Sequence, residues 1–258
     1  MHSFPVLYAS LYATFLIGGF YACAPVSETE LLSFSLGQTT VEVTRTDYGA
    51  PAGIYVVHLH DNEATGIRAA EKVLPSIGGT LISLRNRNQR LLQFSYLKRA
   101  FAADPNRIFT EKGRRHTLEK WSMYNAGAAA GLETFASSLL NLLPTDQIIV
   151  SMHNNTDKAY SILSYLKGEA LALDADSVHR NSAQDTDDFF LTTNKDIYSR
   201  LKEANYNVVL QDNEGATDDG SLSVYYRSRP QAYVNIEAEH GHFDQQVVML
   251  QLLAQIIQ

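Results

Sequence analysis

Two short apolar runs that both end in histidine place the strongest constraint on how this 258-residue chain folds. GIYVVHLH (53–60) and QIIVSMH (147–153) have the length and the β-branched content of buried strands. The first run is followed by a helix-like stretch at 63–79, which contains Pro75 and closes with two glycines. This order predicts an α/β fold with a mixed central sheet flanked by helices. In such sheets, ligands bind beyond the carboxyl ends of the strands, where both histidines stand.

The rest of the pattern adds further elements around these two strands. Residues 117–143 have the composition of one long helix, and 80–86 with 90–96 resemble a hairpin. A helix is expected at 194–205 and an amphipathic helix from Phe243 to the end of the chain. Three late strands are expected at 206–211, 221–228 and 232–240.

The N-terminus has the layout of an export signal. It is apolar from Phe4 to Ala22 and then becomes polar and acidic. We therefore expect residues 1–23 to be an export signal of lipoprotein type, with Cys23 as the lipidated residue, and 24–258 to form a single domain. An ordinary cleaved signal and an uncleaved anchor helix are the alternatives. Each places the domain outside the cytoplasm, in the periplasm or on the cell surface, and the lipid anchor would be its only contact with the membrane.

Charge and cysteine content exclude several classes of protein. The formal net charge is -7, whereas a surface that binds nucleic acid needs a basic excess, so we expect no nucleic-acid partner. Cys23 is the only cysteine, so no intramolecular disulfide can form. The chain also lacks a G-x-S-x-G motif, and an acyl-enzyme mechanism therefore has no evident nucleophile.

The two strand ends supply candidate metal ligands. His60 and Glu63 form an H-x-x-E pair that suits a turn from strand to helix, and His153 is the best candidate for a third ligand. A catalytic zinc takes three protein ligands and lowers the pKa of a water in the fourth position to about 7. The alternative is a buried core histidine with a glutamate that caps the helix. His58, two residues before His60, could be a supporting residue or an alternative ligand.

Two other segments carry groups that could act on a substrate. Asn106 and Arg107 in DPNRIFT could orient and bind a carboxylate, since a guanidinium can do so through two parallel hydrogen bonds. Glu237 and Glu239 are two residues apart, so they share one face of a late strand. A glutamate beside a metal-activated water can take its proton and pass it to a leaving amine. The alternative for Arg107 is a solvated arginine in a loop. The alternative for Glu237 and Glu239 is a pair of carboxylates at the edge of the sheet.

Four motifs together resemble a known family. HDNE, DPNRIFT, MHNNTD and VNIEAEHG are similar, in order and approximate spacing, to motifs of the zinc carboxypeptidase superfamily, and are closest to its aspartoacylase and succinylglutamate desuccinylase branch. The resemblance runs from about Ile54 to His242. It implies a zinc-carboxypeptidase-like fold, of the phosphorylase/hydrolase-like type, and one zinc ion held by His60, Glu63 and His153.

The resemblance also implies roles for residues outside the ligand set. Glu237 would be the general base and acid, with Glu239 in reserve. Arg99, five residues before Asp104, would polarise the scissile carbonyl.

The substrate carboxylate would be bound by Asn106 and Arg107, with Arg227 as a second carboxylate-binding arginine and Arg229 as its alternative.

The chain departs from this branch in three places. One is EAEHGH (237–242), which stands where the branch has a short Gly-Pro sequence after the glutamate. Asp61 replaces the glycine of the first motif, and the sequence ends 21 residues after Glu237, where the branch has a further domain that narrows its pocket. We therefore expect an open cleft.

We also expect a zinc-dependent amide hydrolase that acts on a carboxylate-bearing peptide, with a cell-wall peptide among the candidates, or on an N-acyl amino acid. The alternatives are a non-catalytic ligand-binding module on the same scaffold and a deacylase or esterase.

Overall fold

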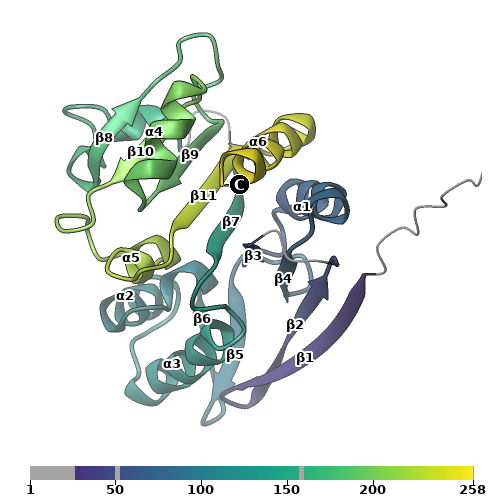
Figure 1. Ribbon diagram of the computed structural model, residues 1–258. Helices are drawn as coiled ribbons and strands as arrows, with labels where there is room; N and C mark the ends of the chain where they lie inside the picture. The colour runs from purple at the N-terminus through teal and green to yellow at the C-terminus, as the bar shows by residue number, and fades with distance from the viewer. Residues whose placement is uncertain (1–26, 50–52, 157–159, 258) are drawn as a thin grey trace, which may run out of the picture.

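A mixed nine-stranded sheet forms the centre of the computed structural model, which describes residues 27–49, 53–156 and 160–257. Its strands are β1 (Glu28–Leu36), β2 (Thr39–Asp47), β3 (Ile54–His58), β4 (Thr80–Arg85), β7 (Ile148–Asn155), β8 (Ala175–His179), β9 (Phe189–Thr192), β10 (Val208–Gln211) and β11 (Tyr233–Glu239). They lie in the order β1-β2-β4-β3-β7-β11-β9-β10-β8 (Figure 1). The predicted export signal at 1–23 lies outside the described residues, and the domain division stays a prediction.

Helices cover both faces of this sheet, so the predicted mixed sheet flanked by helices is confirmed (Figure 1). The helices are α1 (Ala64–Ile77), α2 (Glu111–Trp121), α3 (Ala126–Leu140), α4 (Lys195–Glu203), α5 (Leu222–Tyr226) and α6 (Phe243–Ile256). Three short 3-10 turns are η1 (Pro105–Arg107), η2 (Ile162–Tyr165) and η3 (Ala172–Asp174). A separate two-stranded sheet is formed by β5 (Leu92–Tyr96) and β6 (Arg99–Ala103).

Alternate residues of each central strand enter two separate cores. On β7, Val150 packs with α1, α4 and α6, whereas Ile149 packs on the opposite face with α2, α3 and α5. Val234 and Tyr233 divide in the same way on β11. Strands buried on both faces read as continuous apolar runs, which is why GIYVV and QIIVSM have no polar alternation.

The three strands at the middle of the sheet run in parallel. β3 pairs with β7, and β7 pairs with β11 in a register that sets Glu237 opposite His153. The carboxyl ends of parallel neighbours meet at one edge of the sheet, so groups far apart in the sequence come together there.

Two predictions about local structure are wrong. The stretch at 117–143 is not one helix, because α2 ends at Trp121 and Asn125 starts α3 by accepting a hydrogen bond from the backbone N–H of Ala128. The expected hairpin of 80–86 with 90–96 does not form either. Instead β4 joins the main sheet between β2 and β3, and β5 pairs with β6.

The expected strand at 221–228 is also wrong, since this segment contains the short helix α5. Ser221 precedes the helix and its hydroxyl accepts a hydrogen bond from the backbone N–H of Val224. The serine therefore acts as an N-cap, and this local interaction outweighs the strand preference of the valine and tyrosines that follow.

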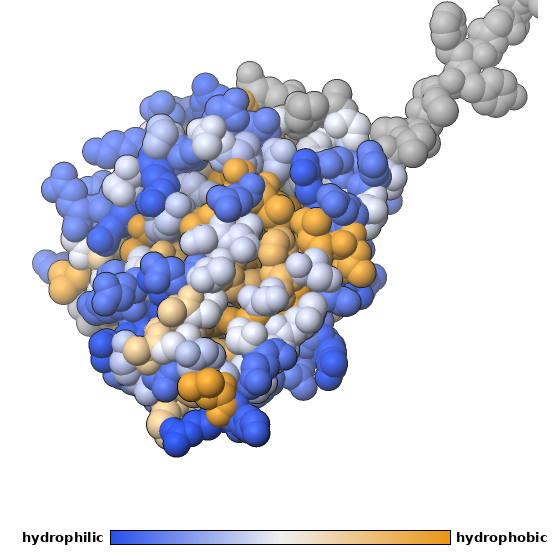
Figure 2. Space-filling model, turned by 90° about the horizontal axis from the view of Figure 1, so that it is seen from below, coloured by the Kyte–Doolittle hydropathy of each residue, from blue (hydrophilic) through white to orange (hydrophobic). Residues whose placement is uncertain are grey.

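The surface has hydrophilic residues at its rim and hydrophobic residues across its middle when seen from below (Figure 2). Large apolar side chains that stay exposed include Trp121 at the end of α2, Met123 between α2 and α3, and Leu97 at the β5–β6 turn. Scattered exposed apolar residues are normal for a globular protein. None of the described helices is long and apolar enough to cross a bilayer.

A close backbone contact joins α2 to the loop before α5. A Cβ atom on Gly113 would lie 2.2 Å from Cα of Gly220 and 2.7 Å from the carbonyl oxygen of Arg107. Gly220 itself has a φ of +83°, and its carbonyl oxygen accepts a hydrogen bond from the N–H of Phe109 at 3.0 Å. Only glycine fits at this crossing.

We therefore expect Gly113→Ala to destabilise the protein by about 1–3 kcal/mol, because backbone atoms must move to admit the methyl group. Gly131→Ala in α3 is the matched control, since its nearest new contact would be at 3.7 Å, and it should stabilise the helix by about 0.5–1 kcal/mol. Chemical denaturation of both variants measures the free energy of unfolding. Equal changes in the free energy of unfolding for the two variants would contradict the close backbone contact at Gly113.

Candidate metal centre

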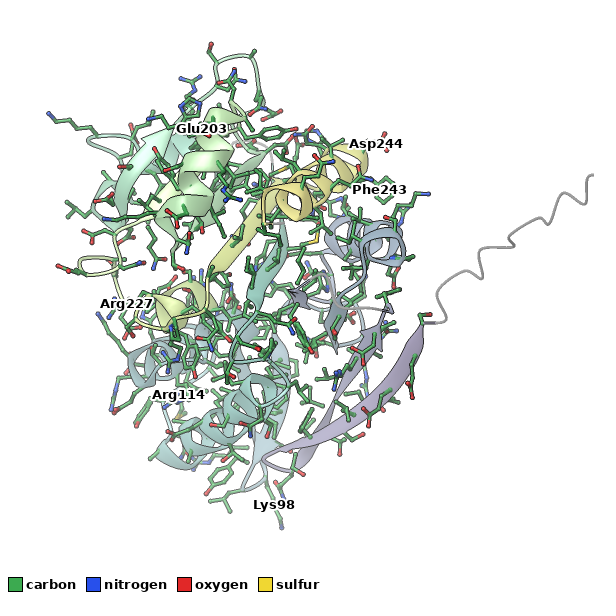
Figure 3. All side chains as sticks on the ribbon, viewed as in Figure 1. Lys98, Arg114, Glu203, Arg227, Phe243 and Asp244 are labelled. Atoms are coloured by element: carbon green, nitrogen blue, oxygen red, sulfur yellow. The ribbon has the colours of Figure 1, made fainter. Side chains whose placement is uncertain are left out.

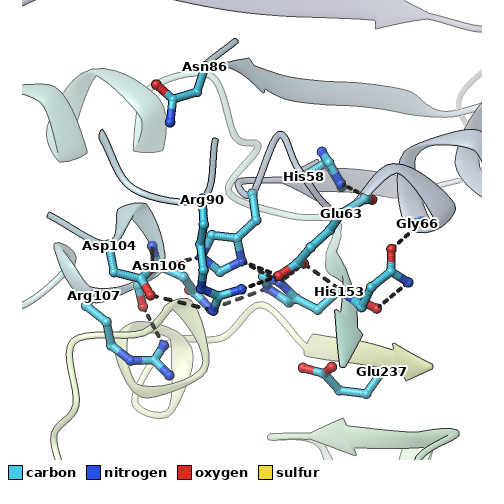
Figure 4. A network of polar contacts seen from close by, with 12 residues as sticks. His58, Glu63, Gly66, Asn86, Arg90, Asp104, Asn106, Arg107, His153 and Glu237 are labelled. Carbon is cyan, nitrogen blue, oxygen red and sulfur yellow. Dashed lines mark hydrogen bonds and ion pairs between the residues drawn. The ribbon is translucent and has the colours of Figure 1, made fainter. Parts of the chain in front are cut away.

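Three buried side chains converge at the carboxyl edge of the parallel strands (Figure 4). His60 follows β3, Glu63 precedes the first turn of α1, and His153 lies in β7. The two Nδ1 atoms are 3.1 Å apart. Each Nδ1 lies 2.9 Å from an oxygen of Glu63, which faces His60 with Oε1 and His153 with Oε2.

This donor set fits a divalent metal ion. Two nitrogens that bind one tetrahedral zinc are separated by about 3.3 Å, close to the 3.1 Å seen between the Nδ1 atoms. Nε2 of His60 donates a hydrogen bond to Asp104 at 2.8 Å, so the lone pair of this imidazole is on Nδ1, toward His153 and Glu63. Two imidazoles and a carboxylate suit several divalent ions, and the geometry supports one metal ion without fixing its identity.

Asp104 holds the first ligand in place. Its Oδ1 accepts hydrogen bonds from His60 and from the N–H of Asn106 at 2.9 Å, and its own N–H donates to the hydroxyl of Thr117 at 2.8 Å. Burial disfavours the ionised form of Asp104, but the interactions with His60, Arg107 and Arg90 hold its pKa below the usual range. The carboxylate therefore stays charged and fixes the orientation of the imidazole.

Glu63 is positioned by its neighbours on both sides. Its Oε2 accepts a hydrogen bond from the N–H of Asn154 at 3.1 Å, and its carbonyl oxygen accepts one from Nε2 of His58 at 2.9 Å. Asn154 also caps α1, since its Oδ1 accepts from the N–H groups of Thr65 and Gly66. Burial disfavours ionisation of Glu63, yet the nearby His153 and His60 keep its pKa well below the usual range.

His58, which the sequence left open as a ligand or a supporting residue, anchors the main chain of Glu63 and is not in the ligand group. It is fully buried, and this burial lowers its pKa to about 4. A neutral imidazole in the core results, two residues before the ligand His60.

A cavity of about 470 Å³ opens in front of the three ligands. Of the candidate residues, it brings together His60, Glu63, Asn106, Arg107, His153 and Glu237. These residues come from four separate segments, and the fold places them around one space.

Glu237 lies on the face of β11 that points into this cavity, as do Tyr233 and Asn235. Its Oε1 accepts a hydrogen bond from the side-chain amide of Asn235 at 2.9 Å. Burial raises the pKa of the Glu237 carboxyl above its usual range. Glu239 shares the strand face but lies beyond the cavity, with its carboxylate 3.4 Å from Nε2 of His242.

Asn106 and Arg107 form the side of the cavity next to the ligands. The Asn106 amide nitrogen lies 3.3 Å from Nε2 of His153, and its Oδ1 accepts from the N–H of Leu222 at 3.3 Å. The Arg107 guanidinium donates from Nη1 to the carbonyl oxygen of Asn106 and pairs through Nε with Asp219 at 3.4 Å. Two contacts thus fix the guanidinium and leave its remaining N–H groups for a ligand.

The structure places two predicted arginines elsewhere. Arg99 is exposed at the start of β6 and does not line the cavity, and its neighbour Lys98 lies at the outer tip of this hairpin (Figure 3). Arg227 also lies outside the lining residues, and its Nη1 donates to the carbonyl oxygen of Ala216 at 2.9 Å. Figure 3 shows it at the edge of the molecule beside α5.

Arg90 lines the cavity, although the sequence did not single it out. Its guanidinium contacts the carboxylate of Glu63 and lies 3.6 Å from that of Asp104 (Figure 4). The surrounding RNRNQR segment resembles a solvated basic loop, so no local signal distinguishes Arg90. Three lining tyrosines, Tyr160, Tyr165 and Tyr233, were missed for a similar reason, since tyrosine is common in strands and loops.

A second group of possible ligands lies at the start of α6. His242 has Nδ1 at 3.1 Å from Asp188 and Nε2 at 3.4 Å from Glu239, and Asp185 completes the group. Both imidazole nitrogens therefore already face carboxylates. These contacts describe an ion-pair cluster, and His242 offers a control for the metal centre.

Comparisons with known proteins give matches among solved structures. No protein-family model matches the chain, and no curated protein matches its sequence. An aspartoacylase family protein from Mesorhizobium loti matches with 12% identity and a TM-score of 0.44 over 90% of this chain and 67% of that one. An N-formylglutamate amidohydrolase from Ralstonia eutropha matches with 12% identity and a TM-score of 0.37 over 91% of this chain and 96% of that one. The first match agrees with the resemblance seen in the four sequence motifs, and the function is argued below from the site itself.

We expect the protein to bind about one divalent ion per chain at this centre. His153→Ala should lose most of the bound metal, because it removes one of three ligands, whereas His242→Ala should keep it. Elemental analysis of the purified proteins measures the metal content, and circular dichroism checks that both variants fold. Equal metal loss in the two variants would place the ion elsewhere.

Proposed function

We propose that the protein is a metal-dependent hydrolase of amide bonds, with one zinc ion held by His60, Glu63 and His153. The proposed substrate is a carboxylate-bearing peptide, with a cell-wall peptide among the candidates, or an N-acyl amino acid. One observation carries this proposal: the cavity holds the two histidines and the glutamate together with a second, separate buried glutamate, Glu237.

The mechanism divides between the metal and the protein. When bound, the metal would polarise the scissile carbonyl and increase the acidity of the attacking water. Glu237 would accept the proton of that water and deliver it to the leaving nitrogen. Its raised pKa supports this role, because a carboxyl group that both takes and gives a proton works best when its pKa approaches the working pH.

Arg107 and Asn106 would bind the carboxylate of the substrate. Asp219 and the carbonyl oxygen of Asn106 already fix the guanidinium, so little side-chain entropy is lost when the substrate binds. A cavity of about 470 Å³ has room for a small peptide or an N-acyl amino acid.

We assign to Arg90 the carbonyl-polarising role that the family resemblance gave to Arg99. Arg90 lines the cavity and contacts the ligand Glu63, whereas Arg99 is exposed on the β5–β6 hairpin. A cationic donor beside the scissile carbonyl would stabilise the negative charge that develops on its oxygen. Arg227 has no comparable place in the cavity, and we give it no role in binding.

The alternatives are a non-catalytic binding module and a deacylase or esterase. The presence of Glu237 beside the ligand set favours turnover over binding alone, because a binding site does not need a proton carrier.

We also propose that residues 1–23 export the protein to the periplasm or cell surface, with a lipid anchor at Cys23. This part of the proposal rests on the sequence pattern. The proposed partner of the exported protein is a small peptide or an N-acyl amino acid. No nucleic-acid partner is proposed.

Glu237→Gln should lower kcat by about 10²–10⁴-fold, because the amide cannot accept the proton. Bound metal should remain, since Glu237 is not in the ligand group. Glu239→Gln is the control and should keep most of the activity. The assay follows release of the free amine from a panel of N-acyl amino acids and short peptides. Activity that survives in Glu237→Gln and is lost in Glu239→Gln would transfer the role of the base to Glu239.

Arg90→Gln should reduce kcat/KM by about 10²–10³-fold through loss of a donor to the carbonyl oxygen. Arg99→Gln should stay close to the parent, because this side chain is exposed outside the cavity. The same amine-release assay compares the two variants after their metal content has been matched. A large loss in Arg99→Gln alone would restore the role that the resemblance assigned to it.

A further inference from the structure

Aromatic and aliphatic side chains line a large part of the cavity. Tyr160 and Tyr165 are joined through their hydroxyl groups at 2.5 Å, and Leu171, Leu191 and Val224 add aliphatic surface. These walls suit the stem of a long side chain, which gains free energy when its methylene groups leave water.

The charges of the cavity are paired unequally. Four carboxyl groups line it, those of Glu63, Asp174, Asp219 and Glu237, against the two guanidinium groups of Arg90 and Arg107. Arg90 contacts Glu63, and Arg107 pairs with Asp219. Glu237 faces the metal ligands. Among the described residues, Asp174 and Glu237 are therefore the lining carboxylates without a cationic partner, and Asp174 is the one that is not fully buried.

Asp174 is held firmly in place. Its backbone N–H donates to the carbonyl oxygen of Leu171 at 3.0 Å, and its carbonyl oxygen accepts from the N–H of Asp212 at 2.9 Å. Its Oδ1 accepts from the N–H of Thr217 at 2.7 Å, and Oδ2 has no partner within the described part of the chain. One carboxylate oxygen is thus oriented by the backbone while the other stays available to a ligand.

The charge of Asp174 also acts on Tyr165, another residue that lines the cavity. Burial raises the pKa of Tyr165, and the charges of Glu237, Asp219 and Asp174 raise it further. Tyr165 stays protonated, and it lines one cavity together with Glu237, Asp219 and Asp174. A substrate anchored at Arg107 therefore shares this cavity with Asp174.

We propose that Asp174 selects substrates whose carboxylate-bearing residue has a cationic side chain, an ammonium or guanidinium group on an aliphatic stem. The carboxylate of that residue binds Arg107, its stem packs against the apolar walls, and its cation pairs with Asp174. This inference rests on the proposed hydrolase function, because it names the substrates of that site. The preference for a cationic side chain is tested separately, by ligand binding.

The test is the binding of free amino acids to the zinc-loaded protein by calorimetry. Lysine, norleucine and glutamate share a carboxylate and differ in the charge of the side chain, and norleucine matches the aliphatic stem of lysine. Lysine should bind about 10–100-fold more tightly than norleucine, the range expected for a charge-assisted hydrogen bond. In Asp174→Asn this ratio should fall close to one, and in Asp174→Lys glutamate should become the preferred ligand.

Asp176→Asn is the matched control, because Asp176 is an exposed aspartate two residues away that does not line the cavity. It should keep the preference for lysine. If the parent binds lysine no more tightly than norleucine, or if Asp176→Asn loses the preference as Asp174→Asn does, the inference is overturned.

Turnover distinguishes this inference from the proposed function. Acetyl-alanyl-lysine, acetyl-alanyl-norleucine and acetyl-alanyl-glutamate serve as substrates for the same proteins. Cleavage of all three at equal kcat/KM would overturn the selectivity and leave the hydrolase function standing. Tight binding of lysine that depends on Asp174, without cleavage of any of the three or of the wider substrate panel, would support the binding site and overturn the hydrolase.

Discussion

The parallel pairing of β3, β7 and β11 is the constraint on which the metal centre depends. It brings the ends of three strands to one edge of the sheet, so that His60, His153 and Glu237 meet although they are separated by up to 177 residues in the sequence. The apolar residues that form these strands are buried on both faces. Burial of the strands and placement of the candidate site residues therefore have the same cause, since a shift in register would disturb the core and these side chains together.

Charge balance explains why these groups can lie so close together. A buried carboxylate is costly unless it is paired, and Glu63 is paired with two imidazoles and with Arg90. The four carboxyl groups and two guanidinium groups that line the cavity leave an excess of negative charge, which a divalent cation would offset. The donor atoms and the electrostatics thus point to the same kind of ligand.

The sequence predicted the fold class, and the structure brings its proposed metal ligands together, because both depend on strong local patterns. An apolar run followed by a histidine marks a strand end, and His60 with Glu63 marks a turn into a helix. Arg90 could not be found in this way, because its role comes from where the β4–β5 connection lies in space. The same limit applies to α5, whose first N–H, that of Leu222, donates a hydrogen bond to Asn106 from a distant part of the chain. β5 pairs with β6 across the two-residue turn of Leu97 and Lys98, which both have positive φ although neither residue type signals such a turn in the sequence.

The glycine contact between α2 and the loop before α5 bears on how this site could change over time. The two backbones meet at Gly113 and Gly220, and beside this crossing the hydroxyl of Thr110 donates a hydrogen bond to Asp218 at 2.7 Å. Asp219 and Ser221, on either side of Gly220, have structural tasks of their own, because Asp219 pairs with Arg107 and Ser221 caps α5. The loop thus acts as a rigid mount, and a new substrate preference on it requires exchanges that replace these two contacts while the glycine crossing and the proposed metal ligands stay as they are.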